Sequence, residues 1–346
     1  MQLQEKSLRL GAAAIALAVV LRLFSGSAAG QLITSLTEQD VMAAMVFLET
    51  GRIVKPTLPT PAETAPTETA PTETEAATTA PAETVPPTIE TSPTEPEIKA
   101  VFSETDVDLV SVNNACGYDA DLPTLLQTPL DWNLREETPK VLIVHSHGTE
   151  SYTKTEDYEE SSAYRTRDTG HNVVSIGARL KKMLEKGGIS VIHDKTMHDA
   201  PSYSNAYPNS RESIETYLKK YPSIELVLDI HRDSVESGGK QMKFAIQEDG
   251  QSVAQLMLVV GTDAAGLVHP KWPENMSLAV KLHAQLEKNT PGICRSISFR
   301  SQRFNQDLSP GALIVEVGSA GNTRAEAIRA ADLLAQGIID LAYGTS

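Results

Sequence analysis

Three short apolar runs, rich in β-branched residues, each stop abruptly at polar or charged residues. The first run, Val141–Val144, is followed by His145-Ser146-His147-Gly148-Thr149-Glu150. The second run is Leu226-Val227-Leu228-Asp229-Ile230, which includes one aspartate and is followed by His231. The third run, Ala312–Val315, is followed by Glu316. Runs of this length and composition are typical of buried strands. In open α/β folds, sites form at the edge where the carboxyl ends of the strands meet. We therefore expect polar residues from all three runs to converge on one site.

Helical patterns alternate with these strands. The segment 172–186 places Val173, Ile176 and Leu180 on one helical face and ends at Gly187-Gly188, and a further strand is predicted over 189–192. This is a βαβ unit, which implies a parallel sheet. Further helices are predicted over 211–221, 276–288 and 323–341, and further strands over 107–112, 241–246 and 254–260. The fold class is therefore α/β, a single domain with a mainly parallel twisted sheet flanked by helices.

Residues 55–99 differ in composition from the rest of the chain. They hold ten of the twenty prolines and eight glutamates, in repeated Pro-Thr-Glu-Thr units with few large apolar residues. Such a segment buries too little surface to offset its ordering entropy, so we expect an extended, disordered linker. It supplies part of the net charge of −15. The folded domain is then residues 100–346, long enough for one sizeable core.

The first thirty residues have the layout of a signal sequence or a membrane anchor. Lys6 and Arg9 precede an apolar run over 10–24, and small residues follow over 25–30. Both readings place the folded domain outside the cytoplasm; a buried helix of that domain is the alternative, which the long linker disfavours. Residues 31–54 form a short juxtamembrane segment with a predicted helix. We expect an uncleaved anchor rather than a cleaved signal.

Two further features limit the partners and the redox chemistry. No basic cluster interleaved with aromatic residues is present, which argues against nucleic acid as a partner. Cys116 and Cys294 are the only cysteines. An extracytoplasmic domain could pair them, but the sequence leaves pairing and free thiols equally open.

The histidines at the strand ends are candidate metal ligands. His147 follows the first strand and His231 ends another, while His171 lies at the start of the predicted helix 172–186. Histidines are common zinc ligands, and three near one sheet edge predict a zinc site. His145 is two residues from His147, so on an extended segment both side chains would share a face. It could replace His147 or support it. The remaining histidines are expected at the surface: His193, His198, His269 and His283.

Glu316 is a lone carboxylate in an apolar strand, and burying it without a partner would be very costly. It suits a general base beside a metal-bound water, and a structural salt bridge is the alternative. Asp229, Arg232 and Asp233 flank His231. They could orient that histidine or pair with one another, or Arg232 could hold a substrate carboxylate; the sequence leaves these roles open.

At these residues the chain resembles a known family, stage II sporulation protein P. The resemblance is carried by His145-Ser146-His147-Gly148-Thr149-Glu150-Ser151-Tyr152, Asp229-Ile230-His231-Arg232-Asp233-Ser234 and Val315-Glu316-Val317-Gly318. That family is related to zinc-dependent N-acetylmuramoyl-L-alanine amidases. The resemblance implies that His147, His171 and His231 hold zinc and that Glu316 is the catalytic base. His171 stands where the amidases have a glutamate, which is a departure from their pattern.

The resemblance also implies a function. The expected activity is zinc-dependent cleavage of peptidoglycan at the amide between muramic acid and the stem peptide, with cutting of peptide cross-links as a further possibility. The expected place is the sporulation septum during engulfment, with stage II sporulation proteins D and M as partners. Two alternatives are a non-catalytic scaffold that binds the wall and a zinc peptidase that acts only on stem peptides.

Overall fold

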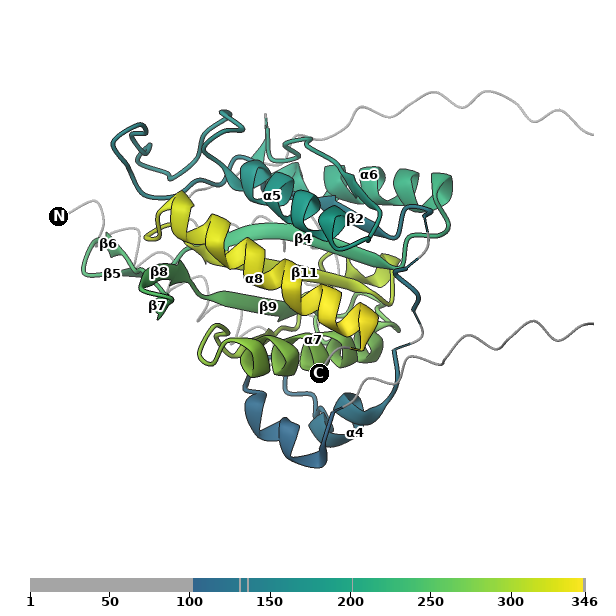
Figure 1. The fold of residues 1–346 in the computed structure, drawn as a ribbon. Coiled ribbons are helices and arrows are strands. Elements are labelled where there is room, and N and C mark those ends of the chain that lie inside the picture. The colour runs from purple at the N-terminus through teal and green to yellow at the C-terminus, as the bar shows by residue number, and fades with distance from the viewer. Residues whose placement is uncertain (1–101, 131, 136, 201, 345–346) are drawn as a thin grey trace, which may run out of the picture. The chain divides into compact units, whose positions relative to one another are not determined.

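Seven strands of the described region form one central sheet (Figure 1). The computed structural model describes residues 102–344 except 131, 136 and 201. The sheet order is β1-β10-β9-β11-β4-β2-β3. Its strands are β1 (Val112–Asn114), β2 (Val141–Val144), β3 (Val191–His193), β4 (Leu226–Asp233), β9 (Leu256–Val260), β10 (Ile297–Phe299) and β11 (Ala312–Ser319). Two small hairpins lie outside it: β5 (Glu236–Ser237) with β6 (Lys240–Gln241), and β7 (Ala245–Glu248) with β8 (Gln251–Ala254).

Most neighbouring strands of the sheet run parallel, as the sequence predicts. β3, β2, β4 and β11 form one parallel set and β9, β10 and β1 form another. The two sets meet at β11 and β9, which pair antiparallel. The predicted α/β class with a mainly parallel sheet is confirmed, with one reversal of direction that the sequence does not reveal.

Helices cover both faces of the sheet. The α-helices are α4 (Leu122–Gln127), α5 (Val173–Lys186), α6 (Ala206–Lys220), α7 (Trp272–Asn289) and α8 (Arg324–Tyr343), and short 3₁₀ helices are η1 (Glu104–Leu109), η2 (Tyr203–Asn205) and η3 (Gln306–Leu308). The larger apolar cluster packs α5, α7 and α8 against one face of the sheet, and these three helices cross the front of it in Figure 1. The smaller cluster packs α6 against the other face.

Local sequence signals explain where the main helices begin. Asn172 caps α5, because its side chain accepts a hydrogen bond from the backbone N–H of Val174. At the start of α8, Thr323 and Glu326 form a reciprocal capping box. Each cap satisfies backbone donors that the first helical turn leaves unpaired. The chain therefore enters both helices at a defined residue, next to the sheet edge where β2, β4 and β11 end.

Several boundaries differ from those predicted. The expected strand 107–112 is the 3₁₀ helix η1 followed by β1, and the expected strand 241–246 is divided between β6 and β7. β10 is not predicted at all, because its three residues are too few to show a period. Cys116 and Cys294 are both free thiols. In the part of the chain described, no helix is long and apolar enough to cross a membrane; the predicted anchor, juxtamembrane helix and linker lie outside that part.

Candidate active site

Two strands bring three acidic and basic side chains to one face of the sheet. Asp229 and His231 lie on β4, two residues apart, and Glu316 of β11 is the direct register partner of His231. Side chains two residues apart on a strand share a face. This is the face covered by α6, because Val227 and Ala312, at the alternate positions before Asp229 and Glu316, belong to the α6 cluster. The predicted convergence of His231 and Glu316 is therefore present in the structure.

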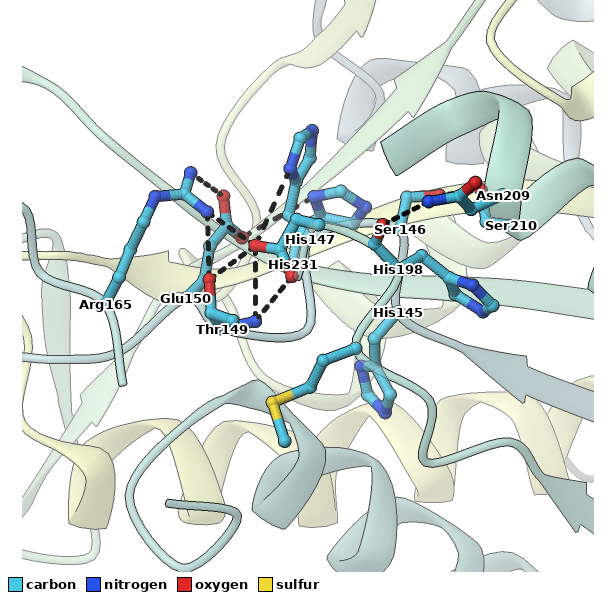
Figure 2. A network of polar contacts seen from close by, with 12 residues as sticks. His145, Ser146, His147, Thr149, Glu150, Arg165, His198, Asn209, Ser210 and His231 are labelled. Carbon is cyan, nitrogen blue, oxygen red and sulfur yellow. Dashed lines mark hydrogen bonds and ion pairs between the residues drawn. The ribbon is translucent and has the colours of Figure 1, made fainter. Parts of the chain in front are cut away.

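His147 reaches the same place from the turn that follows β2. β2 ends at Val144, and the chain turns before His147. The His147 ring contacts the His231 ring edge to face, with ring centroids 5.4 Å apart. Tyr203 stacks on His147 at 4.4 Å, and Tyr207 meets it edge-on at 5.4 Å. Figure 2 shows the two histidines close together. The His147 ring therefore packs against three other rings, those of His231, Tyr203 and Tyr207.

Glu150 belongs to the same turn and joins the cluster. Its backbone N–H donates to the carbonyl of His147 at 3.0 Å, which closes the turn. Its Oε2 accepts a hydrogen bond from the backbone N–H of Arg232 at 3.1 Å and lies 3.5 Å from His231 Nδ1. Arg165 lies 3.6 Å from the other carboxylate oxygen. Glu150 therefore sits between His231 and two arginines, a role that the sequence analysis did not assign to it.

Each site histidine also has a buried aspartate beside it. Asp229 Oδ1 lies 2.9 Å from His231 Nε2, as an ion pair without hydrogen-bond alignment, and Asp229 accepts hydrogen bonds from the N–H and the hydroxyl of Ser146. Asp199 Oδ2 lies 4.0 Å from His147 Nδ1 and accepts a hydrogen bond from Arg165 at 2.7 Å. These aspartates hold the loops around the two histidines. No local pattern in the sequence indicates Asp199.

Burial and charge set the protonation of the cluster. Burial lowers the pKa of His147 to about 3, so its ring is neutral at neutral pH. Burial acts in the same direction on His231, but the negative charges of Asp229 and Glu150 outweigh it and raise its pKa well above the usual value. The pKa of Glu150 is lowered, because the positive charges of Arg232 and His231 outweigh its burial. Glu150 and Asp229 are therefore ionised around a cationic His231 when the site holds no metal.

Glu316 differs from these carboxylates. Its side chain is half-buried, yet its Oε2 is shielded from solvent and has no hydrogen-bond partner among the described residues. Burial raises its pKa to about 8, and the negative charges of Glu150 and Asp233 act in the same direction. The alternative reading, a structural salt bridge, finds no support among the ion pairs of the described region. A carboxyl group whose pKa lies near neutrality can both take and give a proton there.

The contacts described for His171 are all with residues outside this cluster. It stacks on Tyr158 at 4.7 Å, and its ring nitrogens lie 2.9 Å from Asp168 and 3.8 Å from Asp157. All of these partners belong to the loop between β2 and α5. The loop has no hydrophobic period from which its path could be predicted. His171 as a zinc ligand stays a prediction, and the described contacts favour Glu150 for that place.

The expectation that His145 and His147 share a face is wrong. The strand ends at Val144, so the turn breaks the alternation that the prediction requires. His145 contacts His193 on the α5 side, with 2.8 Å between their Nε2 atoms, and its Nδ1 lies 3.0 Å from the carbonyl oxygen of Ile230. In Figure 2 the His145 ring points away from His147 and His231. His145 is therefore part of the packing beneath α5.

The expectation of surface positions for the other histidines is also wrong. His198, His269 and His283 are buried, and His193 is half-buried. His283 lies on α7, which is buried along most of its length. His193 lies on β3, and His198 and His269 lie in loops, where the sequence has no hydrophobic period from which burial could be predicted.

The residues flanking His231 have structural partners. Arg232 donates hydrogen bonds from its guanidinium to the carbonyl oxygens of Ser151 and Tyr164, both at 2.9 Å. Its side chain is almost fully buried, so it anchors the loop after β2 rather than a substrate carboxylate. Asp233 pairs with Arg295 at 2.6 Å.

The donor set of the cluster fits a zinc ion in its chemistry. His147 Nδ1 is buried without a hydrogen-bond partner in the described region, and His231 turns its Nδ1 toward Glu150 while its Nε2 lies 2.9 Å from Asp229. His231 Nδ1 and Glu150 Oε2 lie 3.5 Å apart, and two ligands of one tetrahedral zinc ion lie roughly 3.3–3.6 Å apart for bonds of about 2.0–2.2 Å. As the side chains stand, no three His, Cys, Asp or Glu residues of residues 102–344 are placed to hold a metal ion. Zinc therefore stays a proposal.

A cluster of histidines and carboxylates at the strand ends of a mainly parallel α/β domain is typical of a hydrolase active site. The family model for stage II sporulation protein P (SpoIIP) matches residues 49–339, so the chain belongs to this family. The chain is 29% identical over 228 residues to stage II sporulation protein P of Bacillus subtilis (strain 168), a match that covers 60% of this chain and 54% of that protein. The chain thus spans about half the length of this curated relative.

Solved structures of amidases also match, at low similarity. N-acetylmuramoyl-L-alanine amidase AmiC2 of Nostoc punctiforme is 15% identical, with a TM-score of 0.35, over 58% of this chain and 96% of that one. The CwlD amidase from Clostridioides difficile, solved in complex with the GerS lipoprotein, is 12% identical, with a TM-score of 0.38, over 58% and 98%. Such TM-scores do not establish a shared fold, so the architecture rests on the strand order given above.

Proposed function

We propose that this domain is a zinc-dependent peptidoglycan hydrolase that cuts the amide between muramic acid and the stem peptide. The observation that carries the proposal is the pairing of Glu316 with His231 on adjacent strands, beside His147 and Glu150. A general base next to a set of histidine and carboxylate donors is what metal-assisted amide hydrolysis requires. Membership of the stage II sporulation protein P family supports peptidoglycan as the substrate.

His147, His231 and Glu150 would hold the ion in this proposal. When bound, zinc would lower the pKa of a water molecule and polarise the amide carbonyl. Glu316 would accept a proton from the attacking water and pass it to the leaving amine. The neutral ring of His147 is the form that can donate a lone pair. Arg165 and Arg232 keep Glu150 ionised, and Asp229 holds His231 beside it.

The cellular setting is part of the proposal. We infer that the domain lies outside the cytoplasm behind an N-terminal anchor and acts at the sporulation septum during engulfment. Stage II sporulation proteins D and M are the proposed partners. Family membership supports this setting. Expressing the chain with a reporter at its C-terminus would test the anchor, because an uncleaved segment leaves the full-length protein in the membrane fraction.

Digestion of purified sacculi by the full chain tests the activity. Mass spectrometry should find free stem peptides and muramic acid residues whose lactyl group has become a free carboxylic acid. Altered cross-links without free stem peptides would identify a peptidase instead. No product at all would indicate a scaffold that only binds the wall. Zinc content should be one ion per chain, and chelation should abolish the release of stem peptides.

A further inference from the structure

Tyr207 contacts the His147 ring and has no role in the chemistry proposed above. It is the second residue of α6, whose first turn reaches the strand ends. Its ring meets the His147 ring edge-on, with centroids 5.4 Å apart, and packs against Phe304 at 5.5 Å. The side chain is half-buried. The Tyr207 ring is therefore fixed by aromatic contacts directly beside the His147 ring.

The backbone at Tyr207 is tied to the polar network beneath the site. Its carbonyl oxygen accepts hydrogen bonds from Asn305 Nδ2 at 3.0 Å and from the Ser210 hydroxyl at 3.1 Å. Ser210 in turn contacts the Ser146 hydroxyl at 2.7 Å, and the two residues lie side by side in Figure 2. Ser146 donates to Asp229, the aspartate beside His231. Tyr207 is therefore held in register with the same side chains that hold His231.

The Tyr207 side chain can donate a hydrogen bond through its hydroxyl. The ordinary pKa of a tyrosine hydroxyl, about 10, leaves it protonated at neutral pH. Tyr207, whose ring contacts the His147 ring, therefore brings a neutral O–H group to the site.

Other donors near the site are committed to protein partners. Arg165 donates to Asp199 and Thr149 and lies 4.3 Å above the Tyr203 ring. Arg232 donates to the carbonyl oxygens of Ser151 and Tyr164. Tyr203 lies flat on the His147 ring and is covered by Arg165 on its other side. The Tyr207 ring instead meets the His147 ring at an interplanar angle of 86°.

We propose that Tyr207 is a catalytic residue whose hydroxyl donates a hydrogen bond to the amide carbonyl oxygen of the substrate as negative charge develops on it. The assignment rests on the proposed amide hydrolysis. As the water oxygen bonds to the carbonyl carbon, Glu316 takes the water proton and the carbonyl π electrons move onto the carbonyl oxygen. Tyr207 stabilises that oxygen. The carbonyl then re-forms as the C–N bond breaks, and Glu316 gives the proton to the leaving nitrogen.

The test is Tyr207→Phe in the full chain, assayed on sacculi, because phenylalanine keeps the ring contacts and removes only the hydroxyl. Loss of one oxyanion donor costs about 10²–10³ in turnover. We expect kcat to fall by about a hundredfold, with KM, zinc content and melting temperature near those of the wild type. A phosphinate analogue of the muramoyl–alanine amide should bind the variant more weakly by a similar factor. Tyr217→Phe is the matched control, because Tyr217 lies farther along α6 and packs in the smaller apolar cluster.

Four outcomes overturn the assignment. If the wild-type chain releases no stem peptides, the proposed function fails and this assignment falls with it. If the wild type is active and Tyr207→Phe keeps its kcat within about threefold, the assignment alone is wrong. If kcat and zinc content fall together, Tyr207 supports the metal ligands and is not a donor to the substrate. A loss confined to Tyr203→Phe would place the donor on the other tyrosine and contradict the proposal.

Discussion

Two pairs of histidines lie on opposite faces of the sheet, and their surroundings differ. His145 and His193 contact each other through Nε2 atoms 2.8 Å apart. Because a carbonyl oxygen can only accept, the contact with Ile230 places the proton of His145 on Nδ1. His145 Nε2 therefore accepts from His193. In contrast, His147 and His231 lie beside carboxylates: Asp199 is 4.0 Å from His147, and Asp229 and Glu150 are 2.9 Å and 3.5 Å from His231. A position at a strand end therefore does not by itself mark a functional histidine, and the carboxylates beside the rings are what distinguish the two pairs.

The largest effect is expected at Glu316, which lies on the face of the sheet that holds His147 and His231. Glu316→Gln removes the proton acceptor and keeps the size of the side chain. We expect turnover on sacculi to fall by about 10²–10⁴-fold, the range for loss of a general base, while zinc content stays at the wild-type level. Single-turnover release of stem peptides measures this. Turnover within tenfold of the wild type would mean that Glu316 is a structural carboxylate.

The zinc affinities of two variants can show which residue is the third zinc ligand beside His147 and His231. Glu150→Gln should weaken zinc binding by at least about a hundredfold, because a carboxylate ligand is replaced by a neutral amide. His171→Ala should stay within a few-fold of the wild type, because the partners of His171 lie in its own loop. Competition with a chelator gives both constants. The reverse ranking would restore His171 as the ligand.

A substitution that crowds His145 and His193, on the α5 side, should lower the stability of the protein and leave metal binding unchanged. Gly177 lies under this pair, and a Cβ there would be 2.7 Å from His145 Nε2 and 2.8 Å from His193 Nε2. Gly177→Ala gains up to about 1 kcal/mol in helix propensity but loses about 1–3 kcal/mol to overpacking, so we expect net destabilisation of about 1 kcal/mol. Denaturant unfolding measures it.

Gly337→Ala in α8 is the matched control for this substitution. A Cβ at Gly337 would meet the terminal methyl Cδ2 of Leu286, which can rotate away. We expect a smaller loss of stability there than at Gly177. If Gly177→Ala lost zinc without losing stability, the two histidine pairs would not be separate.

A stability effect similar to that at Gly177 is expected at Glu326, a carboxylate that contacts neither histidine pair. Burial raises the pKa of Glu326, but hydrogen bonds from Lys243, Ser252, Thr323 and Asn322 outweigh it and lower the pKa to about 2. A lowered pKa contributes stability that is present above the unfolded-state value and is lost as the pH falls through the folded-state value. Glu326→Gln should cost about 1 kcal/mol at pH 6. The difference in melting temperature from the wild type should shrink between pH 4.5 and pH 2. A constant difference would contradict the assignment.

The parts of the fold that follow from periodicity were predictable, and so were the site residues on strands. His231 and Glu316 converge because both lie at the carboxyl ends of parallel strands, a consequence of the βαβ connections. His171 and Glu150 lie in or next to the loop between β2 and α5, whose path depends on tertiary contacts such as those of Arg232. Glu150 follows His147 by three residues in one turn, and that spacing is the signal that could have identified it. The reversal at β9 follows from no local pattern.

The register between β4 and β11 has a consequence for the folding of this protein. His231 and Glu316 are paired by backbone position, and the register shifts between Glu316 and Ser319, directly after that pair. A slip of β11 by one residue would turn Glu316 toward the α5 side and bring Val315 or Val317 to face the cluster. Such a chain could keep its sheet and its helices and still be inert. The activity of a purified preparation therefore reports the fraction of molecules with the correct strand alignment, which measures of helix content would miss.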